Sequence, residues 1–389
     1  MKTLLRYLGH FAAVSTVILL LGFALLVSQH GTLGLPANQL AKTVGNEGPH
    51  IFFDGNKVQA EYIRGNLEDG FYKETMPLQF EVSNQLDVYF PLTDLTFQVD
   101  YIPVVETPPS TYSDNAPILA ISDLEGNLAT FLDFLKVHKV INNDNQWQFG
   151  NGHLVLIGDM VDRGFSTTPL LWFIYKLEQE AQLAGGKLHY IIGNHEIKSL
   201  QGNFHSAAEK YFVIAGMLGR QQHELFGPNA AIGRWLASKN VIENINGHLF
   251  VHGGIHPDVS NLGMSIDEIN AVVRNHYRQF YYPNASLHNN IDLITSTKTG
   301  LAWYRGYFRN DVDAQQVKQS LEAFKAKAVI VGHTIQFKVN ALFDNQVIAI
   351  DVKHPDDYNL SFPTKSSEGL LIEDDNYYRL TADGKRVAI

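Results

Sequence analysis

Residues 153–164 read HLVLIGDMVDRG, a short and mostly apolar run that ends abruptly in a polar cluster with glycine at both ends. An apolar run of this length bounded by turn residues is typical of a buried strand. Glycine favours a tight strand-to-loop turn, because it allows positive φ and close backbone approach. The stretch therefore predicts a buried strand that delivers polar side chains into a loop.

The same arrangement recurs four times along the chain. Apolar runs precede SDLEGN (122–127), GNHE (193–196), HGG (252–254) and GHT (332–334). Helical patterns lie between several of these runs, as in residues 167–184 and 265–280. Buried strands with polar loops at their carboxyl ends, separated by helices, indicate an α/β sandwich with a site collected from strand ends.

The loops offer carboxylates, imidazoles and one arginine. These residues are Asp123, Glu125, Asp159, Asp162, Arg163, Asn194, His195, Glu196, His252 and His333. Oxygen ligands mixed with imidazoles suit a divalent metal, and a shared carboxylate commonly holds two ions roughly 3.5–4 Å apart. The pattern predicts a site for divalent metal, with carboxylates available to hold a pair of ions.

This set of loops resembles the calcineurin-like metallophosphoesterases, and more narrowly the phosphoprotein phosphatase family. The family pattern is GDxHG, GDxxDRG, GNHE, HG and GH, and the resemblance covers roughly residues 117–352. Among the branches of the family, the chain looks most like the bacterial, Shewanella-like phosphatases. The resemblance implies two packed mixed sheets flanked by helices.

The resemblance also implies a set of metal ligands. Asp123 would bind the first metal, and Asp159 would bridge both metals. Asn194, His252 and His333 would complete the second site. The cofactors would be two divalent ions, with Mn²⁺ favoured and Fe, Zn or Mg as alternatives.

The implied catalytic groups come from two of the loops and a later segment. Arg163 would hold the substrate phosphate, while His195, oriented by Asp162, would protonate the leaving oxygen. Glu196 would support its loop. For a second arginine clamp we expect Arg305, in AWYRGYF, in preference to Arg309 or Arg278.

Glu125 departs from the family pattern, which has a metal-binding histidine at this position. A glutamate oxygen reaches about as far as an imidazole nitrogen and binds divalent ions at roughly 2.0–2.2 Å. With Glu125, the protein ligands carry three negative charges instead of two, which favours harder ions such as Mn²⁺ or Mg²⁺. We expect Glu125 to be a metal ligand that retains catalysis.

Composition excludes several functions. The formal net charge of −10 argues against a nonspecific nucleic-acid binder, because phosphate backbones are held mainly by Lys and Arg. The chain has no cysteine, which excludes thiolate metal sites and cysteine-dependent phosphatases.

The N-terminus carries Lys2 and Arg6, followed by an apolar run at 11–27 that predicts an uncleaved membrane anchor. The body would then be extracytoplasmic, either periplasmic or at the cell surface; the alternative is secretion after signal cleavage. We expect a signal-anchor or signal peptide at 1–30, a linker at 31–48, a small β unit at 49–110 and a catalytic domain at 111–389. The β unit rests on period-two alternation of apolar residues.

Three functions fit this sequence. The first is a phosphoric monoester hydrolase acting on a phosphoprotein, phosphopeptide or small phosphomonoester by in-line attack of a metal-bridging hydroxide. The second keeps the fold and metals but hydrolyses a nucleotide or dinucleoside polyphosphate. The third is a non-catalytic phosphate binder, supported only by Glu125 and opposed by the intact His195, Asp162 and Arg163.

Overall fold

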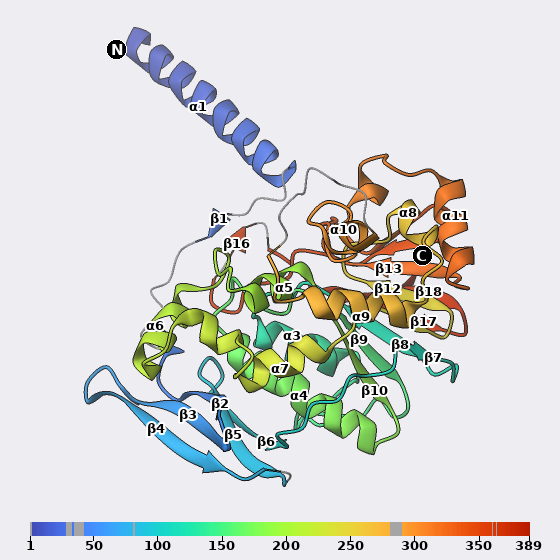
Figure 1. Ribbon diagram of the computed structural model, residues 1–389. Coiled ribbons are helices and arrows are strands. Elements are labelled where there is room, and N and C mark those ends of the chain that lie inside the picture. Colours follow the sequence, from blue (N-terminus) through green and yellow to red (C-terminus); the bar gives the residue numbers. More distant parts are fainter. Residues whose placement is uncertain are drawn as a thin grey trace.

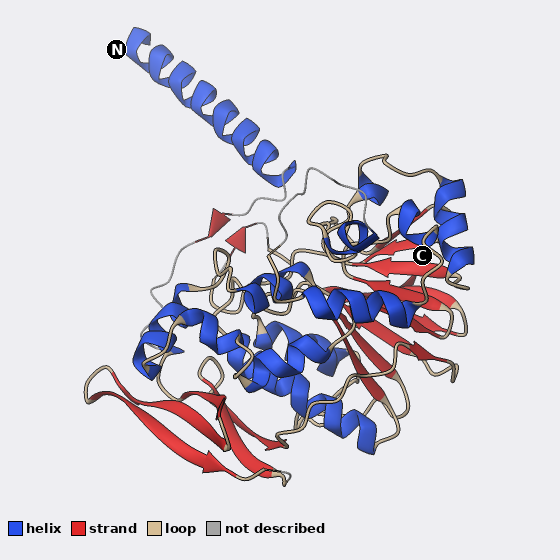
Figure 2. Ribbon diagram, viewed as in Figure 1, coloured by secondary structure: helices blue, strands red, loops and turns tan. Residues whose placement is uncertain are grey.

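The computed structural model describes residues 2–28, 33–34, 43–80, 82–280, 290–359, 361–362 and 364–389. Among these residues, two six-stranded mixed sheets form the centre of the molecule, and helices flank them (Figures 1 and 2). The predicted α/β sandwich is confirmed.

The first sheet has the order β10-β9-β8-β17-β18-β19. Its strands are β8 (Ile118–Ile121), β9 (His153–Ile157), β10 (Lys187–Ile191), β17 (Glu368–Glu373), β18 (Asn376–Thr381) and β19 (Arg386–Ala388). Strands β8, β9 and β10 are parallel, so their carboxyl ends lie at one edge. Each of the three is an apolar run from the sequence that is buried along nearly its whole length.

The second sheet has the order β14-β15-β13-β12-β11-β7. Its strands are β7 (Thr111–Tyr112), β11 (Ile242–Ile245), β12 (His248–Val251), β13 (Ala328–Val331), β14 (Asn340–Leu342) and β15 (Val347–Ala349). Strands β12, β13 and β15 run parallel. One apolar cluster, which includes Ala120 and Val155 of the first sheet and Phe250 and Ile330 of the second, fills the space between the sheets.

Helices cover the outer faces of the sandwich. They are α3 (Leu128–Val137), α4 (Thr167–Leu183), α5 (Asn194–Gln201), α6 (Glu209–Leu218), α7 (Ala231–Ser238), α8 (Pro257–Ser260), α9 (Ile266–His276), α10 (Asn290–Thr295) and α11 (Ala314–Ala323), with the short turns η1 (Gln222–Phe226) and η2 (Gly306–Phe308). Helix α4 is buried on most of its surface because it lies between the sandwich and the N-terminal strands.

The N-terminal strands form two small antiparallel units. One is a sheet of β2 (Glu47–Asp54), β3 (Lys57–Asn66) and β4 (Gly70–Leu78), and the other is the hairpin β5 (Asn84–Phe90) and β6 (Leu95–Tyr101). Aromatic side chains dock the hairpin on α4, with Phe97 edge-on to Phe173 and Tyr101 edge-on to Trp172. Strand β2 begins two residues inside the predicted linker, at Glu47.

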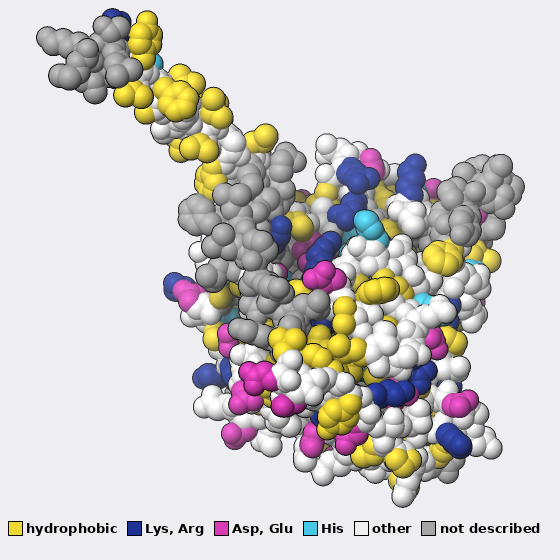
Figure 3. Space-filling model, turned by 90° about the vertical axis from the view of Figure 1, so that its left-hand side faces the viewer, with side chains coloured by type: hydrophobic (Ala, Val, Ile, Leu, Met, Phe, Trp, Pro, Cys, Tyr) yellow, Lys and Arg dark blue, Asp and Glu magenta, His cyan; other side chains and the backbone are white. Residues whose placement is uncertain are grey.

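Helix α1 (Lys2–Ser28) projects from the body, and many hydrophobic side chains lie along the face of it that Figure 3 shows (Figures 1 and 3). In the part of the chain that the structure describes, its segment Arg6–Leu25 is the one helix long and apolar enough to cross a membrane, and none of it is buried. A two-residue strand β1 (Leu33–Gly34) pairs with β16 (Ser361–Phe362).

Candidate active site

The predicted site residues come from five loops, each at the carboxyl end of a strand. Asp123 follows β8, Asp159 follows β9, Asn194 follows β10, His252 follows β12 and His333 follows β13. Because parallel strands end at the same edge of each sheet, the two sheets bring these loops together.

The loops hold an unusual backbone. Six of the site residues have positive φ between 49° and 72°: Asp123, Glu125, Asp159, Asp162, Arg163 and His333. Glycines 126 and 158 also have positive φ, as the sequence predicts. The tight turns therefore include the functional residues themselves.

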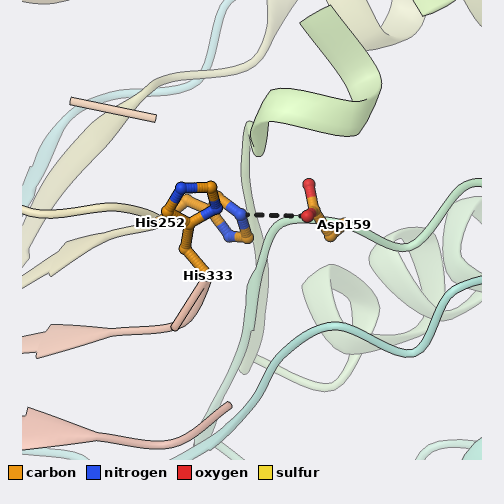
Figure 4. A group of neighbouring side chains, drawn as sticks. All are labelled: Asp159, His252 and His333. Atoms are coloured by element: carbon orange, nitrogen blue, oxygen red, sulfur yellow. Dashed lines mark ion pairs between the residues drawn. The ribbon is translucent and has the colours of Figure 1, made fainter. Parts of the chain in front are cut away.

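Three buried side chains form a group with the geometry of a metal site. One ligand atom each from Asp159, His252 and His333 lies within 4.8 Å of the other two. Figure 4 shows His252 and His333 beside one another, with His252 pointing at the carboxylate of Asp159. The distance from His252 Nε2 to Asp159 Oδ2 is 3.1 Å.

Backbone carbonyls fix the orientation of both imidazoles. His252 Nδ1 donates to the carbonyl oxygen of Ile157 at 2.6 Å, and His333 Nε2 donates to that of Trp303 at 3.1 Å. The other nitrogen of each ring is left facing the centre. Metal-binding histidines have this arrangement, in which the outer N–H is held by a carbonyl or carboxylate.

Asn194 adds a fourth group. Its side-chain oxygen lies 2.8 Å from His333 Nδ1, 3.1 Å from His252 Nε2 and 3.3 Å from Asp159 Oδ2. His333 Nδ1 and Asp159 Oδ2 are acceptors, so an oxygen in this position suits a bound cation, whereas an amide nitrogen would donate to both without one. Two oxygens and two nitrogens therefore fit a divalent cation.

In the absence of a metal, His252 carries the positive charge of the group. Burial opposes its protonation, but the carboxylates of Asp159 and Asp123 raise the pKa of His252 to about 10. Burial and the neighbouring His252 together lower the pKa of His333 to about 2. A bound cation would take over the charge that the His252 proton supplies.

Asp123 lies beside this group on the β8 loop. Its backbone N–H donates to Gly158 O at 3.0 Å, and the His333 N–H donates to its Oδ2 at 3.2 Å. Burial raises the pKa of Asp123 to about 6, with Asp159 acting in the same direction and His252 opposing it. A nearby cation would stabilise the ionised form of this buried carboxyl group.

The side chain of Glu125 forms an ion pair with Arg163. The backbone N–H of Glu125 donates to Asp159 O at 3.0 Å, which ties the β8 and β9 loops together. Its predicted role as a metal ligand stays a prediction.

His195 and Asp162 form the predicted pair. His195 Nδ1 lies 2.6 Å from Asp162 Oδ2, and both side chains are buried. The backbone N–H of His195 donates to Asp159 Oδ1 at 2.9 Å. The free Nε2 lies 3.7 Å from Asp159 Oδ2, so it is close to the metal group.

The arginines separate by position. Arg305 Nη1 donates to His333 O at 2.7 Å and to Thr334 Oγ1 at 3.1 Å, which places its guanidinium at the site. Arg278 instead donates to the carbonyls of Phe226 and Gly233. The geometry favours Arg305 over Arg278.

Glu196 supports the loops, as predicted. Its carboxylate accepts backbone N–H groups from Asp159, Met160 and Gly193 at 2.8–2.9 Å, and the hydroxyl of Tyr190 at 2.9 Å. It therefore ties the β9 loop to the start of α5.

The sequence reasoning missed Asp351. This buried residue follows β15 in the chain. Burial and the nearby Asp123 carboxylate together raise the pKa of Asp351 well above its usual range. The signal that would have found it is an aspartate directly after the apolar run at 347–350.

A calcineurin-like phosphoesterase family model matches residues 116–337. The chain is 26% identical over 285 residues to Shewanella-like protein phosphatase 2 of Arabidopsis thaliana, covering 60% of this chain and 70% of the relative. It is 27% identical over 250 residues to Shewanella-like protein phosphatase 1 of Plasmodium berghei, covering 61% and 67%.

The crystal structure of a cold-active protein-tyrosine phosphatase from a psychrophilic Shewanella species is similar over 88% of this chain and 98% of that chain. The TM-score is 0.74 and the sequence identity is 31%. These findings confirm the resemblance to the Shewanella-like phosphatases. The chain belongs to the calcineurin-like phosphoesterase family and is a metal-dependent phosphatase.

Proposed function

We propose that the chain is a phosphoric monoester hydrolase that uses two divalent ions. The observation that carries this proposal is the group of four inward-facing ligand atoms, from Asp159, Asn194, His252 and His333, next to the His195–Asp162 pair. When bound, the ions would lower the pKa of the attacking water and neutralise phosphate oxygens. Asp123 and Glu125 would hold the first ion together with Asp159.

The remaining side chains would orient the substrate and move one proton. Arg163 and Arg305 would donate to the phosphate oxygens that carry charge in the transition state. His195 would give its Nε2 proton to the leaving oxygen, while Asp162 holds Nδ1. Water displaces the leaving group in line, and no covalent enzyme intermediate is required.

The names of the relatives support one substrate class. Shewanella-like relatives are named as protein phosphatases, and the similar Shewanella structure is named as a protein-tyrosine phosphatase. We therefore propose a phosphoprotein or phosphopeptide as substrate, with small aryl phosphates as surrogates. The extra carboxylate of Glu125 favours Mn²⁺ over softer ions.

Helix α1 supports a location at a membrane. We propose that Arg6–Leu25 anchors the enzyme and that the catalytic body lies outside the cytoplasm. Expression of the full chain with a protease-accessible tag at the C-terminus would test this orientation in intact cells.

The decisive test is turnover by the full chain after metal removal and resupply. Mn²⁺, Mg²⁺, Zn²⁺ or Fe²⁺ should restore hydrolysis of p-nitrophenyl phosphate and of phosphopeptides, and His195→Ala should abolish it. Preferred turnover of a dinucleoside polyphosphate would favour the nucleotide alternative. Binding of phosphate without turnover under any metal would mean a non-catalytic protein.

A further inference from the structure

The loop that carries Arg163 is held from two sides. On one side, Gly164 N donates to Glu125 O at 2.9 Å, and a Cβ on Gly164 would lie 2.5 Å from that oxygen. On the other side, Arg163 N donates to Ser206 O at 2.9 Å. The backbone position of Arg163, from which its side chain extends, therefore depends on the segment that leads into α6.

A fully buried lysine completes the second side. Lys210, in the first turn of α6, has 0% of its surface exposed, and its Nζ donates to Phe165 O at 2.8 Å. The Tyr211 hydroxyl donates to the same carbonyl at 3.2 Å and accepts from Thr168 N at 3.1 Å. The two side chains fix the backbone two residues after Arg163.

The counter-charge for this lysine comes from the N-terminal sheet. Glu47, the first residue of β2, places Oε2 2.7 Å from Lys210 Nζ, and its side chain is 2% exposed. Burial opposes ionisation of Glu47, but the Lys210 ammonium lowers the pKa of Glu47 to about 2. A buried ammonium without a partner would be strongly destabilising, so Glu47 is needed to keep Lys210 at Phe165.

We propose that Lys210 is a positioning residue for Arg163, and that Glu47 makes the N-terminal β unit a structural part of the phosphate-binding site. The inference rests on the proposed function, in which Arg163 holds the substrate phosphate. It predicts that a change at Lys210 weakens phosphate binding although Lys210 itself touches no substrate.

The chain offers a matched control. Lys239 is also a buried lysine, 3% exposed, and it pairs with Glu178 at the junction of α4 and α7. In both cases replacement by methionine removes the ion pair of a buried lysine, although Glu178 is 29% exposed and Glu47 only 2%. Lys210 contacts the loop of Arg163, whereas the side-chain ammonium of Lys239 donates to Glu178.

The experiment uses the full chain in detergent, loaded with Mn²⁺. Two quantities are measured: the inhibition constant of inorganic phosphate and the rise in melting temperature that phosphate produces. We expect Lys210→Met to raise the inhibition constant about tenfold, the equivalent of about 1.4 kcal/mol of binding. Lys239→Met should lower the melting temperature yet leave the inhibition constant unchanged.

A double variant covers the case in which Lys210→Met does not fold. Glu47→Leu with Lys210→Met removes both buried charges, and such replacements are often neutral or stabilising. The double variant still lacks the donor to Phe165 O, so its phosphate inhibition constant should remain raised.

The outcomes separate the two claims. A wild-type inhibition constant in either folded Lys210 variant overturns the inference, and so does an equal rise in Lys239→Met, because that would be general loosening. Arg163→Ala measures the proposed function independently. If Arg163→Ala leaves phosphate inhibition unchanged, the assigned role of Arg163 fails and the inference fails with it.

Discussion

Glu125 and Arg163 form an ion pair, so the carboxylate that replaces the family's metal-binding histidine contacts the arginine assigned to the substrate phosphate. Arg163 is 52% exposed and Glu125 is 23% exposed, which puts the pair at the solvent side of the site. A phosphate must compete with Glu125 for Arg163 unless a cation holds the carboxylate. With the proposed roles of Glu125 and Arg163, metal loading and phosphate binding would be linked through the Glu125 side chain.

Changes at Glu125 should alter metal binding. Glu125→Ala would remove the oxygen ligand that we propose for the first ion, and we expect that ion to bind at least about tenfold more weakly. Glu125→His should restore affinity but shift the best metal from Mn²⁺ toward Zn²⁺ or Fe²⁺. Calorimetric titration of metal-stripped protein measures both, with the exposed Glu322→Ala as control. Unchanged stoichiometry and affinity in Glu125→Ala would exclude a ligand role.

The decrease in hydrolysis rate caused by removing His195 should depend on the leaving group of the substrate. A general acid contributes roughly 10²–10⁴-fold to a rate, and its proton matters most for a basic leaving oxygen. We expect His195→Ala to slow alkyl phosphates by this range and 2,4-dinitrophenyl phosphate much less. The measurement is kcat/KM across a leaving-group series, with Asp162→Asn intermediate. An equal loss for all substrates would contradict the assignment.

Metal removal should lower the stability of the protein, and the size of this loss should depend on Asn194. An ion at a hundred times its Kd stabilises a fold by about 2.7 kcal/mol, so chelation should lower the melting temperature. In Asn194→Leu the second site loses an oxygen ligand, and the effect of chelation should shrink. Gln315→Leu, at an exposed helix position, should respond to chelation like the unmodified chain.

The Glu47–Lys210 pair predicts a pH dependence of stability. The pKa of Glu47 in the folded chain is about 2, below its ordinary value of 4.5. Its contribution is therefore complete above pH 4.5 and is lost as the pH falls toward 2, on the order of 3 kcal/mol. Urea unfolding of metal-free protein at pH 7, 4 and 3 should show a shallower acid loss for Glu47→Gln. Parallel curves for the two proteins would refute this.

The order of strands and loops could be predicted because each signal is local. An apolar run such as 153–157 forms a strand wherever it is buried, and the glycines beside it set the turn. The convergence of Asp159 and Asn194 then follows from the parallel pairing of β9 with β10, whereas His252 reaches them because the second sheet packs on the first. The side-chain pairing of His195 with Asp162 agrees with the expectation from the resemblance.

Contacts between distant segments could not be predicted in this way. Glu47 lies in the segment that the sequence predicts to be a linker. The residues around it carry no signal that Lys210, far away in the chain, will be buried beside it. Asp351 has no flanking glycine and so lacks the turn signal of the other loops. Glu125 illustrates the same limit, since its position in the chain does not decide between a metal and Arg163.

Six site residues with left-handed backbone make the catalytic loops locally unfavourable, since such conformations cost roughly 1–3 kcal/mol each in side chains other than glycine. The substitutions Glu125→Gly and Arg163→Gly would relieve this backbone strain, but they would also remove the carboxylate or the guanidinium. Activity and thermal resistance therefore compete at these positions. Variants selected for heat resistance alone should accumulate substitutions there and lose turnover, whereas joint selection should confine changes to the outer helices.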